Sequence, residues 1–191
     1  MKRFILFLLI SAALPLTPAM AQAPKLEHPK LEVSVNRVEQ DAMHMFEVDA
    51  SGIVQAPPDK VWRILTNYEH MNEFVPDLSS CRILSRNGNE VIIEQFGTAH
   101  FLFMSKSIHL IVRATEQPMS SIDIALVSGD MKHYESHWEL FLVPETGGTR
   151  VVYTGRLVPD FYVPGFLGVK LVRADIEHMM SSVLTRLDQR E

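Results

Sequence analysis

The stretch Ala56–Pro76, APPDKVWRILTNYEHMNEFVP, decides how the rest of the chain is interpreted. Pro57 and Pro58 suit the first turn of a helix, because that turn makes no use of the N–H groups that proline lacks. Asp59 follows them and favours the positive end of the helix dipole. Pro76 stops any continuation of the helix. The stretch therefore predicts a short helical segment that is bounded by prolines.

The apolar residues of this segment recur at helical spacing, as Val61, Leu65 and Tyr68 show. Trp62 lies beside them, and Phe74 follows near the end of the segment. Strand-like sequence flanks the segment on both sides. An aromatic-rich helical piece thus interrupts a chain that is otherwise mostly β.

The remainder up to residue 158 reads as strands, because apolar and polar residues alternate and β-branched and aromatic residues are frequent. Short turn sequences such as Asn87–Glu90 and Gly129–Asp130 separate most of these segments. We expect a curved antiparallel sheet of seven or eight strands, at residues 31–39, 45–54, 81–86, 91–96, 101–113, 121–128, 132–143 and 149–158.

The C-terminal part changes period. From residue 163 to residue 190 the apolar residues are spaced by three or four positions, which predicts one long helix that begins near Pro164. Its apolar face comprises Phe166, Val169, Val172, Ile176, Met179, Met180, Val183 and Leu187. This helix is the large element that can cover one face of the sheet. The fold class expected is α+β.

The N-terminus has the three parts of a secretory signal peptide: a basic start, the apolar run Phe4–Leu16 and the A-x-A site Ala19–Ala21. The alternative is a membrane anchor, but this run is shorter than the ~20 residues that span a bilayer. We expect residues 1–21 to be a signal peptide, 22–30 a flexible leader and 31–191 a single ligand-binding domain. The mature protein would then be periplasmic or secreted.

The charge of the chain argues against nucleic-acid binding. Loss of residues 1–21 removes two basic residues, which leaves 16 basic against 23 acidic residues and a net charge of −7. An acidic protein is poorly suited to nucleic acid or to an anionic membrane surface. Cys81 is the single cysteine, so no internal disulfide can form, and we expect a free, partly buried thiol.

The order of these elements resembles the START-like superfamily (SRPBCC), within it the polyketide cyclase/dehydrase and coenzyme-Q-binding branch. The resemblance covers about residues 45–190 and rests on APPDKVWRILTNYEHMNEFVPDL, SGDMKHYESHWEL and GGTRVVYTGRLVP. It implies a helix-grip fold, in which the sheet wraps around the C-terminal helix and a short helical pair follows the first strands. It also implies an apolar cavity between sheet and helix.

The resemblance places Trp62 and Phe74 at the opening of this cavity; the alternative is that they plug a solid core. Helical spacing and strand alternation indicate which residues form the walls of the cavity. The predicted ligand-binding residues are Trp62, Phe74, Phe101, Phe103, Tyr134, Trp138, Leu140, Tyr153, Phe166, Val169, Val172, Arg173, Ile176 and Met180. Arg173 has a second interpretation, a surface pair with Glu177 four residues on. Ser136 shares the inward face of its strand and would need a polar partner there.

Catalytic and metal-binding patterns are weak. His133, Glu135, His137 and Glu139 fall on one face of a strand, but the other face holds Tyr134 and Trp138. The His/Glu row therefore reads as the solvent side. No nucleophile-elbow, Walker or HExxH sequence is present. We expect no catalytic residue, no metal and no cofactor.

Three functions remain open. The first is an exported carrier, without catalysis, for an apolar molecule such as a lipid, quinone or polycyclic compound. The second is a cyclase or dehydratase on the same fold, and the third is an envelope interaction protein whose cavity is filled. We favour the carrier, as a monomer with transient contact to a membrane or an envelope transport protein, and without nucleic acid as a partner.

The signal-peptide hypothesis predicts a mature chain that begins at Gln22, because all three regions occur in order. The intact mass of the protein recovered from its native host tests this directly. A mass that still includes Met1 would indicate a membrane tether instead.

Overall fold

The computed structural model describes residues 31–40, 43–101, 104–161, 163 and 165–189. Residues 1–30, on which the signal-peptide and leader predictions fall, lie outside the described residues. The elements in chain order are β1 (Glu32–Gln40), β2 (Met43–Val54), α1 (Pro58–Leu65), the 3₁₀ helix η1 (Tyr68–Glu73), β3 (Leu78–Asn87), β4 (Glu90–Phe101), β5 (Met104–Gln117), β6 (Ser121–Gly129), β7 (Met131–Val143), β8 (Gly148–Pro159) and α2 (Gly165–Asp188).

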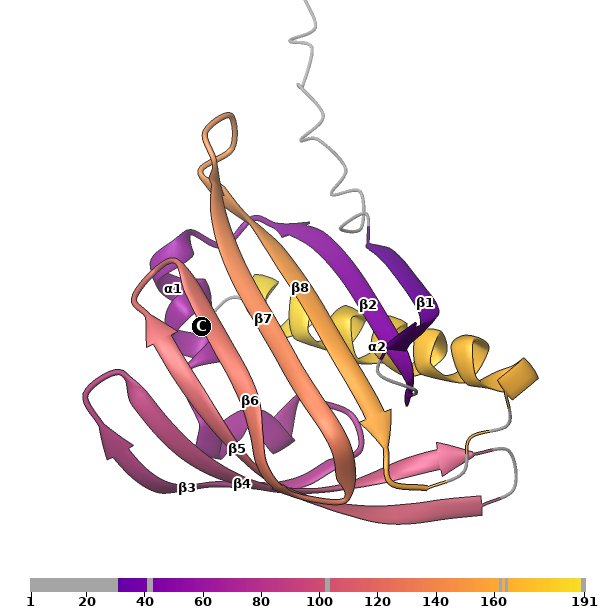
Figure 1. Cartoon of the computed structure of the whole chain (residues 1–191). Coiled ribbons are helices and arrows are strands. Elements are labelled where there is room, and N and C mark those ends of the chain that lie inside the picture. The colour runs from indigo at the N-terminus through magenta and orange to yellow at the C-terminus, as the bar shows by residue number, and fades with distance from the viewer. Residues whose placement is uncertain (1–30, 41–42, 102–103, 162, 164, 190–191) are drawn as a thin grey trace, which may run out of the picture.

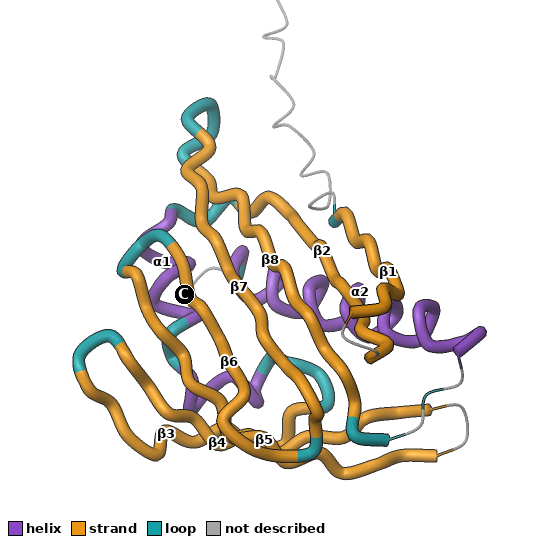
Figure 2. Tube along the Cα trace, viewed as in Figure 1, coloured by secondary structure: helices purple, strands orange, loops and turns teal. Residues whose placement is uncertain are grey.

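The eight strands form one antiparallel sheet in the order β1-β2-β8-β7-β6-β5-β4-β3. Neighbours along the chain pair as hairpins from β3 to β8. β8 then pairs with β2, so the β1–β2 hairpin joins the same sheet. The sheet curves, and both α1 and α2 lie on the same face of it (Figure 1). The trace coloured by secondary structure shows short loops between most strands (Figure 2). This is the predicted helix-grip fold, with eight strands.

One predicted strand is wrong. Residues 101–113 were expected to form a single strand, but β4 extends to Phe101 and β5 begins at Met104, so the reversal falls inside that segment. β4 includes Gly97, which lacks a side chain where the backbone of Asp77 approaches closely. A Cβ at Gly97 would lie 2.8 Å from the carbonyl oxygen of Asp77, which accepts a hydrogen bond from Thr98 N at 2.9 Å.

Helix α2 runs along β2 and approaches it at two glycines. A Cβ on Gly52 of β2 would lie 2.4 Å from Cδ1 of Leu184, and a Cβ on Gly168 of α2 would lie 2.7 Å from the ring of Phe46. The N-terminal half of α2 therefore sits over the Phe46 end of β2, and the C-terminal half over the Gly52 end. Besides α1, the elements nearest to α2 are β1 and β2, so the helix covers one flank of the sheet.

The other flank is covered by α1 and η1, the helical segment between β2 and β3. Val61, Leu65 and Tyr68 are buried in the core, and η1 packs on β3. The α1 start is held by the buried Thr149 hydroxyl, which donates to the carbonyl oxygen of Ala56 at 2.8 Å. The predicted helical pair is thus present. No helix among the described residues is long and apolar enough to cross a membrane.

The close approach of α2 to β2 predicts that Gly52→Ala destabilises the fold. Leu184 is fully buried, so its displaced methyl has little room, and overpacking of this kind costs about 1–3 kcal/mol. The free energy of unfolding in urea measures the cost. The same substitution in a Leu184→Ala background should cost much less, because the opposing methyls are gone. Equal costs in both backgrounds would contradict the proposed contact.

Candidate functional site

The central strands carry their inward side chains between the two covered flanks. On β7 these are Tyr134, Ser136 and Trp138, which alternate with outward-facing charged residues. The register pairs Ser136 with Gly155, and Trp138 with Tyr153, across β7 and β8. The predicted residues Tyr134, Trp138 and Tyr153 therefore lie together on the concave face, as strand alternation required.

One end of this face is a packed core. Trp138 and Tyr153 are 8% and 3% exposed, and their rings meet edge to face with centroids 4.8 Å apart. Leu140 and Val151, one row further, are also buried. These residues form a closed wall, because little apolar surface remains accessible there.

The other end of this face, level with Phe46 of β2, is less filled. Tyr134 on β7, Leu157 on β8, Leu126 on β6 and Ile108 on β5 pack against the core but remain partly exposed. Apolar side chains that face inward and still reach solvent indicate that sheet and helix do not fill the space between them. This end of the concave face is the candidate ligand site.

The helix supplies the opposite wall, and one predicted residue is not part of it. Ile176 and Met180 are buried, while Val169 and Val172 are partly buried towards the candidate site. Arg173 instead lies on the exposed side of α2, where its Nε donates to Glu177 Oε1 at 2.8 Å. The ligand-binding assignment of Arg173 is therefore corrected to the surface ion pair, because its helical position turns it away from the sheet.

The remaining predicted residues divide into two groups. Trp62 and Phe74 pack against the core and stay partly exposed. Phe74 also borders a surface hollow of about 430 Å³ with Ser181 and Thr185 of α2. Phe103 and the side chains of Phe101 and Phe166 lie outside the described residues.

The interior also holds a buried ionic group that the sequence analysis missed. Glu116 on β5 is 8% exposed. Its Oε1 accepts from the Tyr68 hydroxyl at 2.9 Å, and its Oε2 accepts from Arg86 Nη1 at 2.9 Å. Strand alternation could have predicted that Glu116 faces inward, because it lies two residues after the buried Ala114. Its partners could not be predicted in this way, because they come from η1 and β3. The contact ties η1 to the sheet, with one hydrogen bond on each carboxylate oxygen of Glu116.

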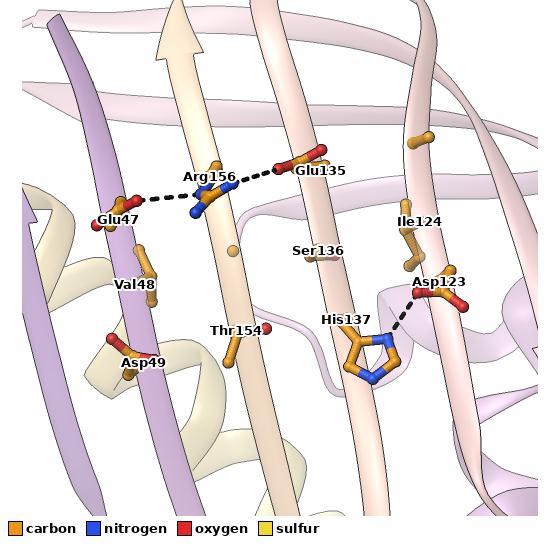
Figure 3. A pocket seen from close by; sticks show the side chains of 12 residues that line it. Glu47, Val48, Asp49, Asp123, Ile124, Glu135, Ser136, His137, Thr154 and Arg156 are labelled. Atoms are coloured by element: carbon orange, nitrogen blue, oxygen red, sulfur yellow. Dashed lines mark hydrogen bonds and ion pairs between the residues drawn. The ribbon is translucent and has the colours of Figure 1, made fainter. Parts of the chain in front are cut away.

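The outer face of the sheet has a hollow of about 570 Å³ over β2, β8, β7 and β6 (Figure 3). Its charges already pair with one another. Arg156 lies 3.1 Å from Glu47 and 3.6 Å from Glu135, and His137 Nδ1 lies 2.7 Å from Asp123. The predicted His/Glu row lies on this face, and no group of three or more possible metal ligands occurs in the described parts of the chain. The hollow therefore combines paired charges with some apolar surface from Val48, Ile124 and Ala125, and it lies on the face of the sheet opposite to the candidate ligand site.

Cys81 is a free thiol, buried on β3. Burial raises its pKa, although a weak hydrogen bond from Gln95 acts in the opposite direction. A thiol that stays protonated is a poor nucleophile, so its role is packing.

Fold and sequence agree on the family. Residues 54–183, more than half of the chain, match the family "Polyketide cyclase / dehydrase and lipid transport". The chain belongs to this family. Its structural relatives include START-superfamily proteins and aromatase/cyclases.

The individual relatives are distant. The chain is similar to the ribosome association toxin RatA of Rickettsia prowazekii, at 21% identity over 74% of this chain and 87% of the relative. The STAR-related lipid transfer protein of Xanthomonas axonopodis has a TM-score of 0.66 at 18% identity, over 87% of this chain and 97% of that fragment. The Zhui aromatase/cyclase of Streptomyces sp. R1128 has a TM-score of 0.63 at 17% identity, over 77% and 96%. At these identities the two structures establish the fold.

The two buried tyrosines predict a loss of stability at alkaline pH. Burial, and then Glu116, raises the pKa of Tyr68, while burial and then Tyr134 raise that of Tyr153. Both hydroxyls thus stay neutral in the folded protein when unfolded tyrosines ionise, near pH 10. Their contribution is fully present below that pH and is lost as the pH rises above it.

We expect the free energy of unfolding, measured in urea, to fall between pH 9 and pH 11. The double variant Tyr68→Phe/Tyr153→Phe should show a shallower fall, because both raised pKa values are then absent. If the free energy of unfolding falls with pH equally steeply in the wild type and in the double variant, neither tyrosine titration is linked to folding.

Proposed function

We propose that this protein is a carrier for an apolar small molecule, such as a lipid, a quinone or a polycyclic compound, and that it performs no chemistry on that molecule. The observation that carries the proposal is the group of inward, partly exposed apolar side chains at one end of the concave face, including Tyr134, Leu126 and Leu157. Membership of a family described by lipid transport supports it.

The polar groups of the interior favour binding over catalysis. Acid–base chemistry needs a titratable group within reach of the ligand and free to exchange a proton. Glu116 is held on both oxygens by Tyr68 and Arg86, and burial keeps the Cys81 thiol protonated. The aromatase/cyclase relatives share the fold, which by itself does not transfer an activity.

The location of the carrier follows from the N-terminal sequence. The basic start, apolar run and A-x-A site support export to the periplasm or beyond. A carrier there would work as a monomer that contacts a membrane or an envelope transport protein transiently. The net charge of −5 for the whole chain gives no support to an RNA partner.

The proposal predicts saturable binding of an environment-sensitive apolar dye, and loss of that binding when the candidate site is filled. Leu157→Trp adds bulk to an inward, partly exposed position of β8 and should weaken dye binding at least about tenfold, since the ring competes for the same space. Thr154→Trp places the same ring on the outer face of the same strand and is the matched control. Fluorescence titration measures both.

Two results would contradict the carrier hypothesis. One is a wild-type protein that binds no dye, and the other is equal loss of binding in both tryptophan variants. Mass spectrometry of organic extracts from protein purified out of its native host then identifies the cargo. Unfolding measurements keep these results interpretable, because they separate a blocked site from an unfolded variant.

A further inference from the structure

Two small residues, Ser136 and Gly155, lie next to each other at the centre of the concave face. Ser136 on β7 pairs with Gly155 on β8, and Ile124 on β6 pairs with Ser136 from the other side. The aromatic residues Tyr134, Trp138 and Tyr153 surround this Ser136–Gly155 notch. A notch between large rings is a place where a ligand group can approach the backbone of the sheet.

The Ser136 side chain is the unusual feature of the notch. The residue is 5% exposed, and its Oγ has no hydrogen-bond partner among the described residues. Burial raises the pKa of Tyr153, and the Ser136 hydroxyl, which lies close to the Tyr153 hydroxyl, lowers that pKa against the larger effect of burial. The two hydroxyls nevertheless form no hydrogen bond within ordinary limits of distance and angle. A buried hydroxyl without a partner destabilises a protein, so its presence requires a reason.

A second hydroxyl lies beside the first. A Cβ built on Gly155 would come within 3.1 Å of the Tyr153 hydroxyl oxygen, which therefore extends over the notch. Both hydroxyls are uncharged. The basic side chains next to the notch in sequence, His137 and Arg156, project to the outer face and are occupied by Asp123, Glu47 and Glu135.

We propose that the Ser136–Gly155 notch binds an uncharged oxygen of the ligand, a ketone or an alcohol, on an otherwise apolar body. The inference rests on the carrier function proposed above and names the ligand class. Ser136 donates to, or accepts from, the ligand oxygen and so acquires the partner that the described part of the chain does not supply. A carboxylate or phosphate is excluded from the notch, because burying a charge without a cation costs more than two hydroxyls return.

Three probes of matched size test the inference: ethylnaphthalene, acetylnaphthalene and naphthoate, each measured by displacement of the apolar dye. The wild-type protein should bind acetylnaphthalene about three- to tenfold more tightly than ethylnaphthalene, which is the range for one net hydrogen bond. Naphthoate should bind most weakly. Ser136→Ala should bring the ketone-to-hydrocarbon ratio close to one, because the hydrogen bond to the ketone is lost.

Two further variants make the test specific. Ser121→Ala removes another buried serine hydroxyl from the same sheet, on the face opposite to the inward Ile122, and should leave the ratio as in the wild type. Gly155→Ala narrows the notch against the Tyr153 hydroxyl and should weaken acetylnaphthalene binding several-fold. The stability of Ser136→Ala in urea should equal or exceed that of the wild type, because no internal hydrogen bond is lost.

The outcomes separate this inference from the carrier function. Dye binding with no ketone preference, with a preference that survives Ser136→Ala, or with naphthoate as the tightest probe overturns the notch and leaves the carrier intact. A Ser136→Ala variant that is less stable but equally selective also overturns it, since Ser136 would then have an internal partner. Absence of binding for the dye and all probes overturns the carrier function itself.

Discussion

The contact of α2 with β2 is the constraint on which the rest of the structure depends. Two glycines, one on each element, allow Leu184 and Phe46 to pack where any Cβ would collide. The contacts occur near the two ends of the helix, so they set both its direction and its distance from the sheet. Because α2 is seated over β1 and β2, it does not lie over the middle of the sheet. The space available to a ligand follows from this off-centre position.

The opposite flank is held by a different kind of interaction. Glu116 accepts hydrogen bonds from Tyr68 and Arg86 and so joins η1, β3 and β5. Such a buried ionic group contributes specificity of arrangement, since breaking it leaves a charge without a partner. With α2 fixed on one side and η1 on the other, the central strands β6 to β8 lie between two supports. A site that is formed before the ligand arrives avoids the cost of ordering it on binding.

Much of the fold could be predicted from the sequence, because the relevant patterns are local. Strand alternation identified the inward face of β7, and helical spacing identified Ile176 and Met180. The failures are where local pattern is insufficient. Residues 101–113 were expected to form one strand, whereas β4 continues through Gly97 to Phe101 and β5 begins at Met104. Arg173 was assigned to the site from its neighbour Val172, whereas its rotation around the helix directs it to Glu177.

The fold class, the acidic charge, the single thiol and the inward side of each strand can be read from the sequence alone, since they depend on composition and on periods of two and 3.6 residues. Only the tertiary structure decided which inward residues close-pack and which remain accessible. Trp138 and Leu157 are both apolar and both face inward, yet Trp138 is packed edge to face against Tyr153 and Leu157 is partly exposed. Their difference depends on the distances at which the fold packs other elements around each of them, and the same holds for Ser136, whose hydroxyl has no partner among the described residues. Those distances are set by contacts between segments far apart in the chain, which no local pattern records.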